Sequence, residues 1–386
     1  MRTVALLALA GAASALRSAP RPSARAISRG ALRPRPSALG ATVDSAEIEA
    51  VLEREYASFF DPMEEKYYED NVEFVDPFIS ISGVPSYKNN VDMLAGRTAL
   101  GAFLFQDAGI ALHGIERPSM GKLRTRWTLR VQAKFIPWQP IARFTGVSDY
   151  TLSLGGKVVK QVDYWDSVNL AESDDGSEEY VEMSKGAALK DFFDQLMNKE
   201  KPPGVASQEL PYELLRRTQE YEVRRYPALL AAETKYDTRP EGFDRLGSYC
   251  GGSNEKSQKV RPFAPSVISS DEAADEKVMR WPISFAAPGQ PAPTGGAPPP
   301  GSVMPSVGIA PVPEVVVAVR RFDSAATQPA VKYHTQQLKE GLRKTGLAPA
   351  EDAEGRLLFA QYDAIFSLSK RNEVWVPLAE GHPWDA

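Results

Sequence analysis

The side chains that carry metal and redox chemistry are scarce in this 386-residue chain, which has one cysteine, Cys250, and three histidines. A single thiol cannot form an intramolecular disulfide, a thiolate zinc cluster or an iron–sulfur site. An excess of positive over negative charge occurs in residues 1–43, which hold seven arginines and no acid. Residues 44–386 keep 38 basic against 50 acidic side chains, a net charge of −12. This excess of acid argues against a nucleic-acid partner, which requires clustered cations.

Residues 1–43 have the composition of a targeting leader. The apolar stretch from Val4 to Ala15 ends in small residues, which is typical of a secretory signal, and the Arg-, Ser- and Pro-rich segment after it is typical of an organelle transit peptide. Together they resemble the bipartite leaders of algae with secondary plastids, so we expect a chloroplast or other plastid location. The alternative is a plain signal peptide followed by a disordered basic arm. The apolar stretch is shorter than the ~20 residues of a spanning helix, so we expect no integral membrane segment in the mature chain and leave peripheral thylakoid association open.

Composition divides the rest of the chain into a first domain, 44–170, a linker, 171–210, and a second domain, 211–386. The linker contains an acidic stretch, an amphipathic helix that begins after Ser184, and a segment with Pro202, Pro203 and Gly204. We expect the helix to dock its apolar face on the first domain. Residues 288–313 hold nine of the 31 prolines and are predicted to form a long exposed loop.

The first domain has the pattern of an α+β fold. Apolar spacing predicts a helix near residues 48–59, and alternation predicts strands at 124–135, 141–154 and 158–168. Gly155 and Gly156 form a hairpin-turn signal between the last two strands. A helix followed by long antiparallel strands is typical of α+β domains.

Four strings in this domain carry a resemblance: YYEDNVEFVDPF, TRWTLRVQAKFIPWQP, FTGVSDYTL and GKVVKQVDYWDSVN. They resemble a plant and algal plastid domain of unknown function. This resemblance implies the cone of a curved antiparallel sheet and helices seen in nuclear-transport-factor (NTF2-like), ketosteroid-isomerase and SnoaL-like proteins. The resemblance implies a pocket inside the cone.

Asp76, Asp163, Tyr164 and Trp165 are candidates to line that pocket. A carboxylate whose pKa is raised by apolar walls can act as a general base, which gives the hypothesis of an enzyme acting on a small apolar substrate. In the alternative interpretation Asp76 caps a turn before Pro77 and Asp163 pairs with an arginine such as Arg126. His113 fits a half-exposed strand position better than a catalytic one.

The second domain shows one pattern twice. Each copy reads strand, helix, strand, strand, which implies a pseudo-symmetric (βαββ)2 barrel-like sheet flanked by two helices. The helix of each copy and its neighbouring strands can enclose an apolar cleft, the natural ligand site. The first copy covers 221–236, 240–249, 260–270 and 277–287, and the second covers 314–322, 329–344, 356–366 and 372–378.

The strings PYELLRRTQEYEVRRYPALLAAET, SYCGGSNEKSQKV, VAVRRFDS and KRNEVWVPL are similar to the SOUL family of haem-binding proteins. The family implies reversible, non-covalent binding of haem or a related porphyrin in a shallow apolar cleft with cations at its rim. We therefore infer a plastid tetrapyrrole buffer or carrier without catalysis. Two alternatives stay open: the enzyme described above, and a scaffold at the thylakoid or lipid-droplet surface.

The resemblance also suggests individual binding residues. On the first helix, Phe243, Leu246 and Tyr249 are candidates for the apolar wall and Arg245 for the rim, with Lys370 and Arg371 as further cations. Phe263 stands where the family commonly has small side chains and is expected to fill part of the cleft. The alternative for each aromatic residue is ordinary core packing.

No metal ligand is assigned from the sequence. Some family members have a histidine where this chain has Arg225, and arginine does not ligate iron. His334 and Cys250 are weaker candidates, because a helix histidine more often faces solvent and a cysteine at a helix end is usually buried packing.

Overall fold

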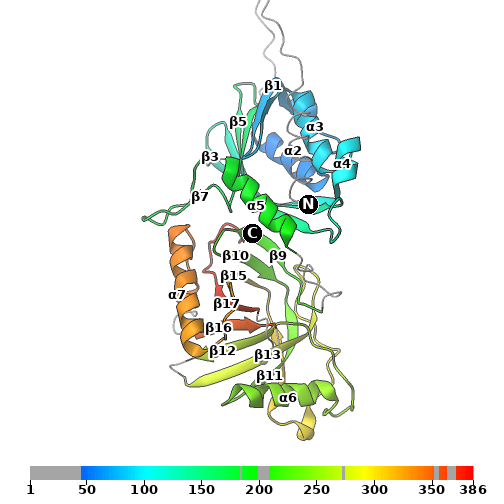
Figure 1. Ribbon diagram of the computed structural model, residues 1–386, viewed down its shortest axis with the longest axis vertical. Coiled ribbons are helices and arrows are strands. Elements are labelled where there is room, and N and C mark those ends of the chain that lie inside the picture. Colours follow the sequence, from blue (N-terminus) through cyan, green and yellow to red (C-terminus); the bar gives the residue numbers. More distant parts are fainter. Residues whose placement is uncertain are drawn as a thin grey trace, which may run out of the picture. The chain divides into compact units, whose positions relative to one another are not determined.

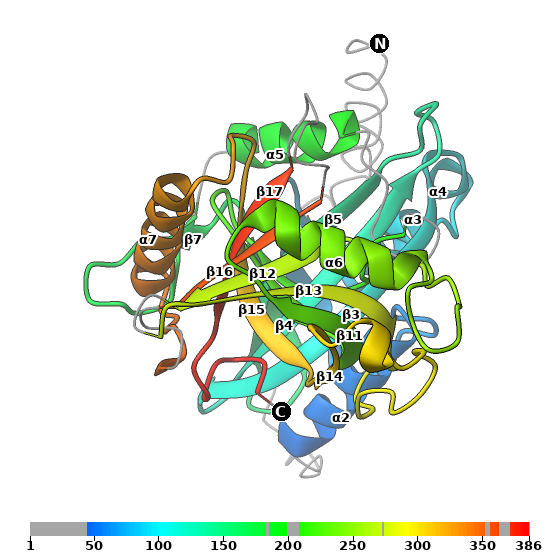
Figure 2. The same ribbon diagram turned by 90° about the horizontal axis from the view of Figure 1, so that it is seen from below.

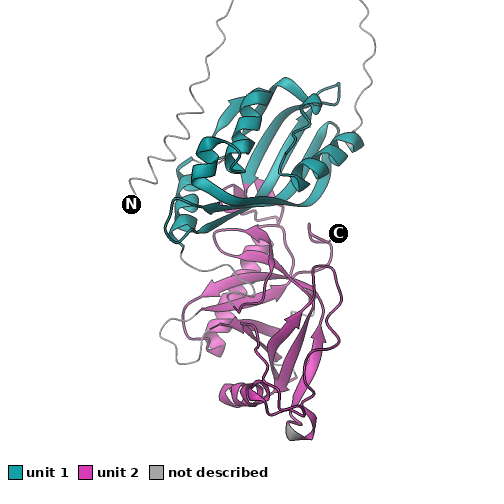
Figure 3. Cartoon of the chain, turned by 90° about the vertical axis from the view of Figure 1, so that its right-hand side faces the viewer, with its two compact units in different colours: residues 1–164, 183–198 teal, residues 165–182, 199–386 magenta. Residues whose placement is uncertain are grey.

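The computed structural model describes residues 45–182, 185–198, 208–271, 274–351, 356–362 and 371–385. The chain divides into two compact units (Figure 3): unit 1 comprises residues 1–164 and 183–198, and unit 2 comprises 165–182 and 199–386. The main chain therefore passes from one unit to the other three times. The predicted linker, 171–210, is thus divided between the two units, since its acidic part belongs to unit 2 and its helix to unit 1.

Unit 1 is built on a six-stranded sheet with the order β2-β1-β6-β5-β4-β3 (Figure 1). β1 pairs antiparallel with β2 and parallel with β6. The strands predicted at 124–135, 141–154 and 158–168 are confirmed within a few residues as β4, β5 and β6. The elements are α2 (Ser45–Ala57), η1 (Glu65–Tyr67), β1 (Tyr68–Val75), β2 (Ser80–Ser82), α3 (Val84–Leu94), α4 (Ala99–Leu104), β3 (Phe105–Ser119), β4 (Lys122–Ala133), β5 (Ile141–Leu152), β6 (Val158–Trp165) and α5 (Lys185–Met197).

The helix α5 packs on the sheet of unit 1, as its apolar face predicts. The ring of Phe192 stacks on that of Phe144 of β5 with 5.9 Å between centroids, and the backbone N–H of Arg143 donates to the Gln195 side-chain oxygen at 2.7 Å. Trp138 Nε1 donates to the Leu196 carbonyl at 3.0 Å. These contacts hold the C-terminal half of α5 (Lys185–Met197) against the sheet.

Unit 2 contains a two-stranded ladder, β7 with β8, and a nine-stranded sheet with the order β14-β11-β13-β12-β16-β17-β15-β10-β9. Figures 1 and 2 show α6 beside β11 and β13, and Figure 1 shows α7 along β15, β16 and β17. The elements are β7 (Leu170–Ala171), β8 (Glu179–Tyr180), β9 (Glu213–Arg217), β10 (Glu222–Tyr226), β11 (Leu229–Lys235), α6 (Arg239–Gly251), β12 (Ser266–Asp271), β13 (Glu276–Phe285), η3 (Gly301–Val303), β14 (Val307–Val312), β15 (Val315–Phe322), α7 (Gln328–Lys344), β16 (Arg356–Gln361) and β17 (Asn372–Pro377).

The sheet of unit 2 confirms the predicted internal symmetry. β11, α6, β12 and β13 form the first copy, and β15, α7, β16 and β17 form the second. In the sheet the copies read β11-β13-β12 and β15-β17-β16, and they meet where β12 pairs antiparallel with β16. The fold class, α+β with curved sheets, is therefore as the sequence predicts.

Two details of the predicted strands are wrong. Residues 221–236 form two strands, β10 and β11, which pair with different partners on either side of Pro227, because proline has no N–H to continue a ladder. The predicted loop 288–313 contains β14, which pairs with β11. Pro311 does not prevent this pairing because β14 is an edge strand.

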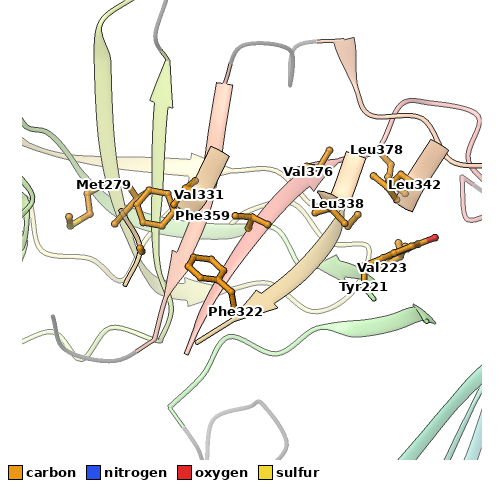
Figure 4. Packing of buried hydrophobic residues seen from close by; sticks show 14 of the residues in the cluster. Tyr221, Val223, Met279, Phe322, Val331, Leu338, Leu342, Phe359, Val376 and Leu378 are labelled. Atoms are coloured by element: carbon orange, nitrogen blue, oxygen red, sulfur yellow. The ribbon is translucent and has the colours of Figure 1, made fainter. Parts of the chain in front are cut away.

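Side chains of the nine-stranded sheet alternate between two clusters. The helix-side cluster lies under α6 and α7 and includes Leu246. Figure 4 shows Leu338 and Phe359 among its members. The inner cluster lies on the opposite face and includes Tyr226 and Trp375. Strand alternation sends neighbouring residues to opposite faces, so one β-rich sequence builds both clusters. No helix in the described ranges combines the length and apolar character needed to span a bilayer.

Candidate functional site

The helix α6 carries the predicted wall residues at different depths. Leu246 and Tyr249 have no exposed surface and belong to the helix-side cluster. Tyr249 also donates its hydroxyl to the Pro298 carbonyl at 2.7 Å. Phe243 is half-buried at the margin of the same cluster. Core packing encloses Leu246 and Tyr249 completely, so Phe243 is the one of these three side chains that a ligand can still contact.

The surroundings of Phe243 form a half-buried apolar margin between α6, β13 and β14. The ring of Phe243 lies 5.9 Å from that of Trp281, and a Cβ on Gly247 would meet Trp281 Cη2 at 3.9 Å. Ala232 of β11 pairs with both Trp281 and Ile309, so a small side chain separates two large ones on this face. We call Phe243, Gly247, Trp281, Ile283 and Ile309 the α6 margin.

The predicted cations are engaged in other contacts. Arg245 Nη1 donates to the Lys235 carbonyl at 2.6 Å, and its guanidinium also pairs with Glu241. Arg371 Nη2 lies 2.7 Å from Glu209 Oε1, and the guanidinium lies 3.6 Å from the centre of the Tyr362 ring. Tyr362 packs on the inner cluster. Lys370 lies outside the described residues.

The loop after α6 holds three cations that the sequence reasoning missed. Lys256, Lys259 and Arg261 are exposed, and within the described ranges none of them makes an ion pair. The backbone N–H of Val260 donates to the Cys250 carbonyl at 2.9 Å, which holds this loop against the end of α6. The available signal was the basic run KSQKVR, which begins at Lys256, a short distance after α6 ends at Gly251. These side chains can meet anionic groups of a ligand seated near α6.

Phe263 lies on the opposite face of the sheet from the α6 margin. Its ring packs on the inner cluster, 5.2 Å from that of Phe285. Its backbone N–H donates to the Pro282 carbonyl at 2.8 Å. The predicted binding residues are therefore divided between two faces, with Phe243, Arg245, Leu246 and Tyr249 on α6 and with Phe263 and Arg371 beside the inner cluster.

The weaker iron-ligand candidates are poorly suited to that role. Burial raises the pKa of the Cys250 thiol to about 11, so the thiol stays protonated at neutral pH. The ring of His334 on α7 is occupied by stacking on Phe322 at 4.5 Å; burial lowers its pKa, which favours the neutral imidazole and does not itself argue against ligation. Arg225 Nη1 lies 2.8 Å from Glu213 Oε2. No group of three His, Cys, Asp or Glu side chains suited to a metal occurs in the part of the chain that the structure describes.

In unit 1, hydrogen bonds fix one carboxylate oxygen of each of the two aspartates of the predicted pocket. Asp76 Oδ1 accepts the backbone N–H groups of Phe78 and Ile79 at 2.6 and 2.7 Å, so it does cap a turn. Asp163 Oδ1 accepts Ser148 Oγ at 2.6 Å and Gln161 Nε2 at 2.7 Å. Burial is the main cause that raises the pKa of Asp163 to about 7 and that of Asp76 to about 6.

Three other expectations for this region have clear outcomes. The predicted ion pair of Asp163 with Arg126 is wrong, because Arg126 Nε lies 2.9 Å from Glu116 Oε1 instead. Tyr164 alternates to the other face of β6 from Asp163, and Trp165 is buried at the start of unit 2. His113 is half-buried in β3 and bonds Thr128 Oγ1 through Nε2 at 2.8 Å, the strand role that was expected.

Comparison with protein-family models gives two matches. Residues 207–377 match the family described as "SOUL heme-binding protein", and residues 46–161 match "Uncharacterized conserved protein (DUF2358)". These confirm both resemblances seen in the sequence. No curated protein matches the chain.

Several solved structures are similar to part of the chain. An NTF2-like protein of unknown function from an Exiguobacterium species is 21% identical and covers 30% of this chain and 98% of its own, with a TM-score of 0.24. An NTF2-like protein of unknown function from Cytophaga hutchinsonii is 11% identical, covering 33% and 95%, with a TM-score of 0.24. A putative SnoaL-like polyketide cyclase from Mesorhizobium loti is 18% identical, covering 32% and 99%, with a TM-score of 0.24.

Proposed function

We propose that this chain is a plastid protein that binds haem or a related porphyrin non-covalently at the α6 margin of unit 2 and acts as a tetrapyrrole buffer or carrier. The observation that carries the proposal is the pair of half-buried rings, Phe243 and Trp281, beside Gly247, in a region that matches a haem-binding family. The composition of residues 1–43 supports the plastid location.

The physical basis of binding is the loss of water from a flat ring system. A porphyrin laid against Phe243, Trp281 and Ile309 removes apolar surface from water on both partners. Gly247 allows the ligand to approach the helix closely because it has no side chain. The carboxylates of a porphyrin stay in water at the edge of the site.

The cations of the loop after α6 suit those carboxylates. Lys256, Lys259 and Arg261 are exposed, and a carboxylate near any of them gains a charge-assisted hydrogen bond. Arg245 is a poorer partner because it would have to leave Glu241 and the Lys235 carbonyl. Binding therefore rests on apolar contact and charge, with no iron ligand assigned.

Titration of purified residues 44–386 with haemin tests this proposal. We expect a saturable change of the Soret band at micromolar ligand, and Trp281→Ala should weaken the affinity at least tenfold, or by about 1.4 kcal/mol. The matched control is Phe263→Ala, which removes a half-buried ring on the opposite face and should leave the affinity unchanged. Absence of a saturable Soret change, or equal losses in both variants, would contradict the proposal.

The location is tested separately. A fluorescent protein fused behind residues 1–43 should enter plastids of an alga with secondary plastids. Secretion of the fusion would instead indicate a plain signal peptide. Pigment that co-purifies with the chain from plastids, identified by its absorption spectrum, would name the physiological ligand.

A further inference from the structure

Two buried polar atoms of β13 lack a hydrogen-bond partner. Trp281 Nε1 and Ser284 Oγ are both enclosed, and neither makes a hydrogen bond in the part of the chain that the structure describes. Buried polar groups are almost always paired, and an indole N–H in particular usually finds an acceptor. A donor that has lost water without gaining an acceptor costs free energy. Two such atoms, three residues apart on one strand, therefore require an explanation.

Both side chains lie on the face of the sheet that α6 covers. In the ladder of β11 with β13, Trp281 lies opposite Ala232 of the helix-side cluster. Ser284 lies opposite Leu230, two residues away on β11. Opposite residues in a ladder share a face, and so do residues two apart on one strand. Ser284 is therefore on the same face as Trp281, and the register shift in β13 accounts for their odd spacing.

The course of α6 places Ser284 under the end of that helix. A Cβ on Gly242 would lie 3.0 Å from Met279 Cε, and one on Gly247 would lie 3.9 Å from Trp281 Cη2. The helix therefore advances along β13 in the direction of rising residue number. It gains about 1.5 Å per residue, against about 3.4 Å for a strand. At this rate the last turn of α6 lies level with Ser284, so both unpaired atoms lie beneath this helix.

The side chains around these two atoms are within reach of a ligand. Trp281 and Ser284 are half-buried as residues, although the two polar atoms themselves are enclosed. Phe243, whose ring lies 5.9 Å from that of Trp281, and Ile309 are half-buried as well. Rotation of side chains that are already partly exposed is therefore enough to bring the indole N–H and the hydroxyl to a ligand in the α6 margin.

The chemistry of the two atoms suits a neutral acceptor oxygen. An indole N–H can only donate, and a serine hydroxyl can donate as well. A porphyrin carboxylate is a poor partner here, because a charge that leaves water needs a cation beside it. Arg280, the cation next to Trp281 on β13, alternates to the other face and pairs with Glu233 at 2.9 Å. A carbonyl group conjugated to the macrocycle is uncharged and lies in the ring plane, so it fits both donors.

We propose that the α6 margin prefers a tetrapyrrole with a carbonyl group on the edge of its macrocycle, whose oxygen accepts hydrogen bonds from Trp281 Nε1 and Ser284 Oγ. This inference rests on the proposed function and deepens it by naming the class of ligand. Haem carries only alkyl, vinyl and carboxyethyl groups at its edge, so it leaves both donors unpaired. A ring with a ketone or formyl group satisfies them, while its apolar surface still lies against Phe243 and Ile309.

Soret titrations of the full-length chain with 2,4-diacetyldeuteroporphyrin IX and with mesoporphyrin IX test this preference. The two porphyrins share their propionates and differ only in carrying acetyl or ethyl groups at two ring positions. We expect the diacetyl compound to bind at least tenfold more tightly, or by about 1.4 kcal/mol. Trp281→Phe, which keeps a ring but lacks the N–H, should lower this ratio at least about threefold, and Ser284→Ala should lower it as well. The matched control is Trp384→Phe, which makes the same change at another buried indole without a partner and should leave the ratio unchanged.

Equal affinity for the two porphyrins would overturn the inference, and so would equal ratios in Trp281→Phe and Trp384→Phe. If Trp281→Phe does not fold, Ser284→Ala decides, because a ratio that this variant leaves unchanged contradicts the site. Saturable binding of both porphyrins with equal affinity removes only the carbonyl preference and leaves tetrapyrrole binding intact. If neither porphyrin nor haemin binds, the proposed function itself fails. The two failures are therefore distinguishable.

Discussion

The guanidinium of Arg216, which has no exposed surface, lies with its Nη2 atom 3.1 Å from Oε2 of Glu178. Asp166 Oδ1 lies 3.9 Å from Nε of the same arginine. Both acids come from the segment 165–182, which precedes α5, whereas Arg216 belongs to β9. The acidic segment therefore supplies the charges that a buried cation of unit 2 requires.

Glu178→Gln should destabilise unit 2. The substitution removes the nearer carboxylate of buried Arg216 but leaves Asp166 at 3.9 Å, so the cost should lie between about 1 kcal/mol and the ~3–5 kcal/mol of a buried charge with no partner. Urea unfolding measures the loss. The control is Glu172→Gln, which removes the exposed partner of Lys344, 2.8 Å away, and should cost less than about 1 kcal/mol. Equal losses would show that Arg216 does not depend on Glu178.

Arg224 and Arg225 are adjacent but should respond differently to substitution. Arg224 is 7% exposed, and its Nη1 contacts Glu373 Oε1 and Oε2 at 3.1 and 3.0 Å. Arg224→Met leaves Glu373 buried without its cation and should cost about 3–5 kcal/mol. Arg225→Met removes a half-exposed pair with Glu213 and should cost about 1 kcal/mol or less. Chemical unfolding of the two variants checks the order, and a larger loss for Arg225→Met would refute it.

Gly247→Ala should separate stability from ligand binding. Alanine in place of glycine within a helix stabilises it by up to about 1 kcal/mol, and the new Cβ would make ordinary contact with Trp281 at 3.9 Å. The same methyl group narrows the α6 margin, so haemin affinity should fall while the unfolding free energy does not. Gly251→Ala, at the end of the same helix with nothing within 4 Å of its Cβ, should leave affinity unchanged. If the haemin affinity of Gly247→Ala is unchanged, the ligand does not bind beside α6.

The pH dependence of unfolding should report Glu55. Burial raises its pKa from the usual 4.5 to about 7, against hydrogen bonds from Tyr68 and Glu64 that lower it. The folded chain therefore holds a proton that the unfolded chain releases, and stability falls as pH rises from about 4.5 to 7. Glu55→Gln removes this loss, so relative to wild type it should gain about 3 kcal/mol between pH 4 and pH 8. A pH-independent difference in urea unfolding would rule this out.

The repeated pattern of unit 2 was predictable because each copy shows the same change from strand to helix periodicity. The division at Pro227 was also within reach, since proline interrupts a ladder. The edge strand β14 was not, because Pro311 lies within it and the surrounding composition indicates a loop. Residues 307–312 form a strand only because they pair with β11, from Thr234 opposite Val307 to Leu229 opposite Val312.

The candidate sites were less predictable than the fold. The spacing of α6 indicated which residues share a helix face, but not that Tyr249 is enclosed while Phe243 is half-buried. Strand alternation separates Arg224 from Arg225, yet the sequence does not say which one faces the core. The electrostatic effect of Asp76 on Asp163 depends on the parallel alignment of β1 with β6, which links distant segments and leaves no local signal.

The three passages of the main chain between units constrain how the protein is made and how it evolves. During synthesis unit 1 stays incomplete until α5 has left the ribosome, by which time residues 165–182 of unit 2 have already emerged. Genetic recombination at any single point between the two family matches would separate α5 from the rest of unit 1, or the acids that Arg216 requires from the rest of unit 2, or both. The two units are therefore expected to be inherited together, with the intervening segment as an indivisible part of both.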